Sequence, residues 1–210
     1  MIPVKILAVR YLANASPALA KALGAPDGYP SLGLITTDSD DATYIALDEA
    51  TKAADVKVSY GRSFYAGAAN ASTPYAGEVI GILAGATPGA VRSGMEAVIG
   101  ALERVGFEEV GGVPYLAHTV SSAGSFLSAE AGVRQGSALA YLIAPPLESM
   151  YAMDAALKAA DVKLCKLYSP PSETNFGGGL LSGSQSACDA ACQAFARAVA
   201  EVAQNPIQRK

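Results

Sequence analysis

The segment TTDSDD places three carboxylates, Asp38, Asp40 and Asp41, directly before a predicted helix. Carboxylates at this place can accept hydrogen bonds from the free N–H groups at the positive end of the helix. Helix capping by at least one of the three aspartates is the simpler interpretation. The alternative is a function that these aspartates have only in the first half of the chain. The aligned place in the second half of the chain reads APPLES, without the aspartates. A role specific to the first half therefore stays open.

Two cysteines and one histidine are the other side chains that could bind a metal. Cys188 and Cys192 are spaced i, i+4 on a predicted helix, and His118 lies in the apolar segment PYLAHTV. A single histidine adds only one ligand to a cysteine pair, whereas a structural metal site normally has four ligands. The cysteines are therefore predicted to pack in a core, His118 to be structural, and no metal site is expected. Three cysteines without a secretory signal also argue against a disulfide framework.

Motifs of the common catalytic classes are missing from the sequence. There is no G-x-S-x-G, C-x-x-C or H-E-x-x-H, and the glycine-rich NFGGGLLSGSQ has no P-loop lysine. A pair of carboxylates needs no fixed spacing to work as acid and base, so the absence does not exclude catalysis. The chain is nevertheless predicted not to be an enzyme.

Composition limits the class of protein and its partners. The chain has 210 residues, 51% of them hydrophobic, which is enough for a sizeable core in one medium domain or two small ones. Its net charge is -4 and no stripe of Lys and Arg is present, so nucleic acid is not an expected partner. No apolar run approaches the roughly 20 residues that span a bilayer. A soluble, cytoplasmic protein is expected.

The sequence contains an internal repeat. LDEATKAADVKV at 47–58 returns as MDAALKAADVKL at 153–164, an offset of 106 residues. A later predicted helix, 88–105, also recurs, at an offset of 97, with the apolar stripe of Val91 and Met95 replaced by Cys188 and Cys192. This replacement favours core packing for the two cysteines.

Each half is predicted to contain the same order of elements: strand, short helix, strand, helix, strand, strand and long helix. In the first half these elements are expected at 4–10, 16–23, 31–36, 42–54, 56–62, 78–83 and 88–105. The chain is thus an α/β protein with a duplicated unit, and the domains are predicted to be 1–109 and 110–210.

The repeated phrase, the segment SLGLITTDSDDATYIALDEATKAADV, the PPSETNF stretch and the terminal NPIQRK resemble the bacterial microcompartment (BMC) shell domain. The order of elements is similar to its circularly permuted form, and the tandem shell proteins of ethanolamine-utilisation microcompartments match along essentially the whole chain. The resemblance implies an α/β (α+β) fold of two tandem circularly permuted ferredoxin-like domains. It also implies a homotrimer that mimics a hexagon, carries a central pore and tiles edge to edge with other shell proteins in a cytoplasmic microcompartment.

The resemblance also implies a ligand site. Ethanolamine is a small cation with a hydroxyl group, so its site requires a carboxylate for the ammonium and short polar groups for the rest. By resemblance, Asp40 and Glu78 hold the ammonium, and Thr174 and Asn175 of the second half meet the hydroxyl. No cofactor is expected to be required, although the cobalamin used by an enzyme of such compartments is a possible transported or bound molecule.

Two connections rich in Gly, Pro and Ser, 62–74 and 169–179, lie at equivalent places in the two halves. They are candidates for mobile loops over a pore, and ordinary surface loops are the alternative. Since Thr174 and Asn175 belong to both the proposed site and a proposed loop, binding of ethanolamine could regulate opening. The candidate pore-loop residues are Arg62, Ser63, Phe64, Tyr65, Ser172, Glu173 and Phe176; Tyr65 and Tyr75 are possible pocket walls, with core packing equally open.

A competing interpretation is a soluble sensor of an amino alcohol, built on the same duplicated ferredoxin-like fold. A shell protein assembles into sheets, whereas a sensor stops at a small oligomer. An enzyme acting on an amino alcohol is the third interpretation, and it requires an acid/base pair in a closed pocket.

Overall fold

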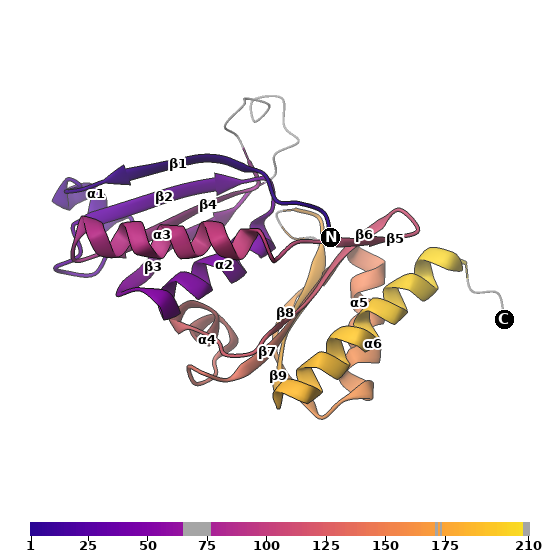
Figure 1. The fold of residues 1–210 in the computed structure, drawn as a ribbon. Helices are drawn as coiled ribbons and strands as arrows, with labels where there is room; N and C mark the ends of the chain where they lie inside the picture. The colour runs from indigo at the N-terminus through magenta and orange to yellow at the C-terminus, as the bar shows by residue number, and fades with distance from the viewer. Residues whose placement is uncertain (65–76, 171, 173, 208–210) are drawn as a thin grey trace. The chain divides into compact units, whose positions relative to one another are not determined.

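A computed structural model describes residues 1–64, 77–170, 172 and 174–207 (Figure 1). The chain forms two compact units. The N-terminal unit comprises Pro3–Gly106 together with the short segment Gly124–Leu127. The C-terminal unit comprises Met1–Ile2, Phe107–Ala123 and Ser128–Lys210. The chain passes from one unit to the other at 106/107, and the 124–127 segment belongs with the N-terminal unit; the domain division at 109/110 stays a prediction.

The N-terminal unit has one antiparallel sheet with the strand order β1-β2-β4-β3. Helices α2 and α3 pack side by side on one face of this sheet, as Figure 1 shows. The short α1 and its flanking residues contribute to a small apolar cluster with β2 and β4. The elements are β1 (Ile6–Leu12), α1 (Pro17–Ala22), β2 (Ser31–Thr37), α2 (Asp40–Ala53), β3 (Val56–Ser63), β4 (Val79–Gly85) and α3 (Pro88–Leu102).

The C-terminal unit repeats this arrangement with one extra strand, in the order β5-β6-β7-β9-β8. Helices α5 and α6 cover one face of the sheet. The elements are β5 (Glu108–Val110), β6 (Val113–Val120), α4 (Ser125–Ala131), β7 (Ala138–Ala144), α5 (Pro146–Ala159), β8 (Val162–Tyr168), β9 (Gly177–Gly183) and α6 (Gln185–Gln204). No helix in the described part of the chain combines the length and the apolar character that crossing a membrane requires.

The predicted order of elements is confirmed in both halves. Even an irregularity recurs, because β3 and β8 each carry a register shift, between Val58 and Tyr60 and between Leu164 and Lys166, at the repeat offset of 106. The three-residue β5 was not predicted. Its hairpin with β6 turns at two glycines with positive φ, Gly111 and Gly112, a conformation that favours glycine.

The predicted core positions of Cys188 and Cys192 are confirmed. Both thiols are buried in the apolar cluster between α5, α6 and the sheet of the C-terminal unit. Burial raises the pKa of Cys192 to about 11, and the Thr119 hydroxyl lies 3.5 Å from its Sγ. The predicted strand around His118 is β6, where His118 pairs with Tyr141 of β7.

Candidate functional site

The turn between β2 and α2 places Asp40 at the start of the helix. Thr37 Oγ1 accepts a hydrogen bond from the backbone N–H of Ser39 at 3.1 Å and lies 2.7 Å from the hydroxyl of Thr43. These buried bonds fix the chain as it leaves the sheet. Asp40 Oδ1 then accepts the N–H of Asp41 at 2.9 Å. One of the three aspartates therefore meets a free N–H of the first turn, as predicted.

Asp38 lies outside this capping arrangement. It is exposed, and its Oδ1 accepts the backbone N–H of Lys5 at 2.7 Å. Its carboxylate therefore ties the residue before β1 to the end of β2. The sequence pattern did not distinguish this role from capping, because the partner lies 33 residues away.

Glu78 lies at the same end of the sheet as Asp40. Its N–H donates to the carbonyl of Thr37 at 2.8 Å, and its own carbonyl accepts the N–H of Phe64 at 2.9 Å. The preceding Gly77 fits only without a side chain, because a Cβ there would lie 1.9 Å from the Thr37 carbonyl oxygen. The strand order β2-β4-β3 thus brings the ends of three strands together at the N-terminus of α2.

The electrostatics of this end of the sheet are dominated by uncompensated negative charge. Burial raises the pKa of Asp40, and hydrogen bonds from Ser63 and from the backbone oppose that shift. Burial raises the pKa of Glu78 to about 7, and the charges of Asp40 and Asp38 add to the effect. Among the described residues, no Lys, Arg or His forms an ion pair with Asp40 or Glu78. Such a site is suited to a small cation.

Two serines complete the polar lining, and sequence reasoning did not assign them to it. Ser63 hydrogen-bonds to Asp40 and lies 2.7 Å from the hydroxyl of Tyr44. Ser39 Oγ is buried and has no hydrogen-bond partner within the described residues. A buried hydroxyl without a partner is costly, so Ser39 is a candidate to bind a ligand next to Asp40. From the sequence, only the position of Ser39 directly before Asp40 could have indicated a role in ligand binding.

Thr174 and Asn175 lie in the turn before β9 of the C-terminal unit. Asn175 adopts a left-handed conformation with φ of 63° and donates its N–H to the carbonyl of Ser172 at 3.2 Å. The N-terminal unit brings Asp40 and Glu78 together, whereas the participation of Thr174 and Asn175 in the same site stays a prediction.

The residues predicted for pore loops and pocket walls lie only partly within the described residues. Arg62 and Ser63 are the last residues of β3, paired with Ile80 and Val79, so the strand predicted to end at Arg62 extends by one residue to Ser63. The candidate loop therefore starts after the strand, and a role of Arg62 and Ser63 at a pore stays a prediction. Phe64 extends the strand pairing through its N–H. Tyr65, Tyr75 and Glu173, which were also predicted, lie outside the described residues.

Ser172 and Phe176 are described and lie before β9. The ring of Phe176 packs edge-on against Phe107, with 5.7 Å between the ring centroids. This aromatic pair fixes the end of the turn within the C-terminal unit. A role of Ser172 and Phe176 at a pore stays a prediction.

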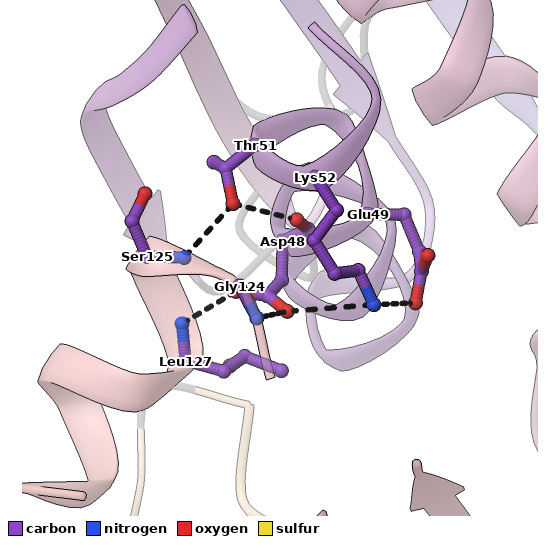
Figure 2. A network of polar contacts seen from close by, with 7 residues as sticks. All are labelled: Asp48, Glu49, Thr51, Lys52, Gly124, Ser125 and Leu127. Atoms are coloured by element: carbon purple, nitrogen blue, oxygen red, sulfur yellow. Dashed lines mark hydrogen bonds and ion pairs between the residues drawn. The ribbon is translucent and has the colours of Figure 1, made fainter. Parts of the chain in front are cut away.

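A second polar network, which the sequence did not reveal, lies on α2 (Figure 2). Asp48 is fully buried and accepts the N–H of Gly124 at 2.6 Å and the N–H of Leu127 at 2.8 Å. Thr51 Oγ1 accepts the N–H of Ser125 at 2.9 Å. The oxygens of Asp48 are thus already occupied, so this network holds the 124–127 segment in the N-terminal unit and is not a ligand site.

Groups that could hold a metal are not found in the described part of the chain, where no cluster of three or more His, Cys, Asp or Glu side chains has the required arrangement. The acidic site itself offers the carboxylates of Asp40 and Glu78 for a positive charge and the hydroxyls of Ser39 and Ser63 for a polar group.

Comparison with known proteins identifies the family. A BMC domain model matches residues 31–112. The bacterial microcompartment shell protein EutL of Clostridium perfringens is 60% identical over 206 residues, which cover 96% of this chain and 95% of the relative. EutL of Escherichia coli is 51% identical over 97% of this chain and 95% of the relative. The chain belongs to the EutL family of bacterial microcompartment shell proteins.

Solved structures of EutL have the same fold. The crystal structure of the ethanolamine utilization protein EutL from Leptotrichia buccalis matches with a TM-score of 0.95 and 56% identity, over 99% of this chain and 98% of that one. The trimeric shell protein PduB, at 18% identity and a TM-score of 0.79 over 95% of this chain and 89% of that one, shares the fold alone. The predicted α/β fold of tandem shell domains and the predicted resemblance are thereby confirmed, and the chain is a structural component of a microcompartment shell.

Proposed function

We propose that this chain forms a homotrimeric tile of an ethanolamine microcompartment shell and that the tile binds ethanolamine. The acidic site at Asp40 and Glu78 carries the ligand part of the proposal. Burial raises the pKa of both carboxyls, and repulsion by Asp40 and Asp38 raises that of Glu78 further. A bound ammonium group would neutralise this repulsion, and each N–H donor of the ammonium would form a charge-assisted hydrogen bond.

The polar surroundings support an amino alcohol over a simple amine. An ammonium between Asp40 and Glu78 leaves a hydroxyl two carbons away to be satisfied. Ser39 and Ser63 offer hydroxyls next to Asp40, and Thr174 and Asn175 are the candidates from the C-terminal unit. The EutL structure from Leptotrichia buccalis is described as an ethanolamine utilization protein, which agrees with this ligand class.

The duplicated chain supports the proposed trimer. Three copies present six similar units, and closed rotational symmetry leaves an opening on the axis. We propose this opening as a pore for large metabolites or cofactors, with cobalamin as one candidate cargo. Ligand-dependent opening requires that the open and closed states bind ethanolamine unequally. Equal affinities in variants locked open and locked closed would contradict such gating.

Calorimetric titration of the purified protein with ethanolamine tests the site. We expect saturable binding by the wild type and at least a tenfold loss of affinity in Asp40→Asn and in Glu78→Gln, because each loses one charge-assisted contact worth about 1.5–3 kcal/mol. Glu49→Gln, an exposed acid on the same helix, is the matched control and should bind like the wild type.

Ethylene glycol, which replaces the ammonium with a second hydroxyl, should give no measurable heat. Native mass is determined on the same samples so that loss of binding is not confused with loss of assembly. An intact wild-type oligomer that does not bind ethanolamine would contradict the ligand part of the proposal and return Asp40 to a purely structural role.

A further inference from the structure

The Asp48 network has a counterpart in the second half of the chain that lacks its partner. Asp154 stands 106 residues after Asp48, at the same position of the repeated phrase. The side chain of Asp48 is fully buried against the 124–127 segment, whereas 63% of the side chain of Asp154 is exposed and pairs with Lys158 at 2.6 Å. The helical surface at this position is therefore covered by the 124–127 segment in the first half and exposed in the second half.

The segment that covers Asp48 also has a counterpart. Residues 124–127 correspond to residues 16–19 at an offset of 108. The glycines that follow support this alignment, since Gly24 and Gly28 have φ values of 71° and 83°, and Gly132 and Gly136 have 63° and 85°. Leu127 is 1% exposed in its docked position, whereas Leu19 is 45% exposed. An apolar side chain that is buried in one half thus faces solvent in the other.

The two surfaces differ in ways that match each other. In the covered surface, the N–H of Ser125 donates to Thr51 Oγ1. In the open surface, the position of Ser125 is taken by Pro17, which has no N–H, and the position of Thr51 is taken by Leu157, which has no acceptor. Donor and acceptor are absent together, so docking at the open surface would leave neither of them unpaired.

A second pair of positions exchanges size. The ring of Phe126 lies against Gly61, where an added Cβ would be 3.7 Å from the ring, and 5.8 Å from the ring centre of Tyr44. The counterpart of Phe126 is the small Ala18, and the counterpart of Gly61 is Leu167, which is 44% exposed. A large residue over a small one would thus be replaced by a small residue over a large one, which would conserve the volume of the contact.

We propose that residues 16–19 of one copy dock on α5 and β8 of a second copy of this chain, in the way that residues 124–127 dock on α2 and β3. Leu19 would be buried there, Ala18 would lie on Leu167, and Asp154 would accept the backbone N–H groups of Ser16 and Leu19. The exposed carboxylate of Asp154 is complementary to these donors, as the buried Asp48 demonstrates in the covered surface.

This contact is heterologous, because the two surfaces lie on different halves of the chain. Each copy carries one 16–19 segment and one α5/β8 surface, and contacts of this kind close into a ring when the rotation between copies allows it, as the proposed trimer requires. The inference rests on the homotrimer of the proposed function and names the residues that hold it together.

The substitution Leu19→Asp tests the contact, with Ile207→Asp as the matched control. Both positions are exposed in the single chain, Leu19 at 45% and Ile207 at 74%, so neither change disturbs the core. Analytical ultracentrifugation is expected to give a trimer for the wild type and for Ile207→Asp, and mainly monomer for Leu19→Asp at the same concentration. The circular dichroism spectra should be alike.

A second variant, Asp154→Ala, examines the polar part through hydrogen exchange of the peptide that contains Leu19. Exchange is expected to be at least tenfold faster than in the wild-type trimer, and unchanged in Glu103→Ala, which removes an exposed carboxylate elsewhere. A wild-type monomer at all concentrations would overturn the proposed trimer. A wild-type trimer that persists in Leu19→Asp, with unchanged exchange in Asp154→Ala, would overturn only this contact.

Discussion

Ethanolamine affinity is expected to fall about 30-fold when the pH is lowered from 8 to 5.5, as one-proton linkage predicts. The pKa of Glu78 is about 7 because the carboxyl is buried near Asp40 and Asp38. Above this value Glu78 carries the charge that attracts an ammonium group. Below it the carboxyl is protonated, and the cation must displace a proton to bind, while an alkylammonium group stays charged throughout.

Titration calorimetry at the two pH values measures this effect directly. In Glu78→Gln the dependence on pH should shrink to less than about threefold, since the titrating group is gone. Proton release on binding near pH 6.5, detected as a change of the observed heat between buffers of different ionisation enthalpy, should accompany binding by the wild type only. An affinity that is equal at both pH values in the wild type would contradict the role of Glu78.

Replacing Asp48 with alanine is expected to lower the free energy of unfolding by about 3 kcal/mol, because the buried N–H groups of Gly124 and Leu127 lose their acceptor. Burial raises the pKa of Asp48, but the two backbone donors and the nearby Lys52 stabilise its ionised form. Removing the carboxylate while its buried N–H donors remain costs more free energy of unfolding than removing both partners would. The 124–127 segment should lose its fixed place as a result.

Denaturant unfolding at equal protomer concentration gives the difference in stability. Glu49→Ala, at the neighbouring exposed position that pairs with Lys52, is the control and should change the free energy of unfolding by less than about 1 kcal/mol. If Asp48→Ala is as stable as Glu49→Ala, then the hydrogen bonds in Figure 2 contribute little to holding the segment.

The order of elements was predictable because the repeat supplies each element twice. Two copies of a pattern at a fixed offset reveal helices and strands that one weak pattern leaves ambiguous. Helix ends were less accurate: α2 begins at Asp40, two residues before the predicted start. The aspartates there look like residues that precede a helix, yet Asp40 and Asp41 form its first turn, where negative charge is also favourable.

The site was predictable only in part. Asp40 and Glu78 were named through family resemblance, since nothing in their spacing of 38 residues brings them together. The strand order that does so depends on pairing of β2, β4 and β3, which is a long-range property of the fold. For the same reason Ser39 was not named at all, and Ser63 was named only as a candidate pore-loop residue. The Asp48 network joins residues 76 and 79 positions apart, without a local sequence pattern.

Electron microscopy of the purified protein over a range of concentrations tests the central claim that the chain works as a shell tile. Copies that assemble edge to edge should form flat sheets with a hexagonal repeat, and the native mass at low concentration should be that of a trimer. Sheets of this kind are the predicted result. Particles that remain small and separate at every concentration would contradict the tile and favour a ligand sensor built on the same fold.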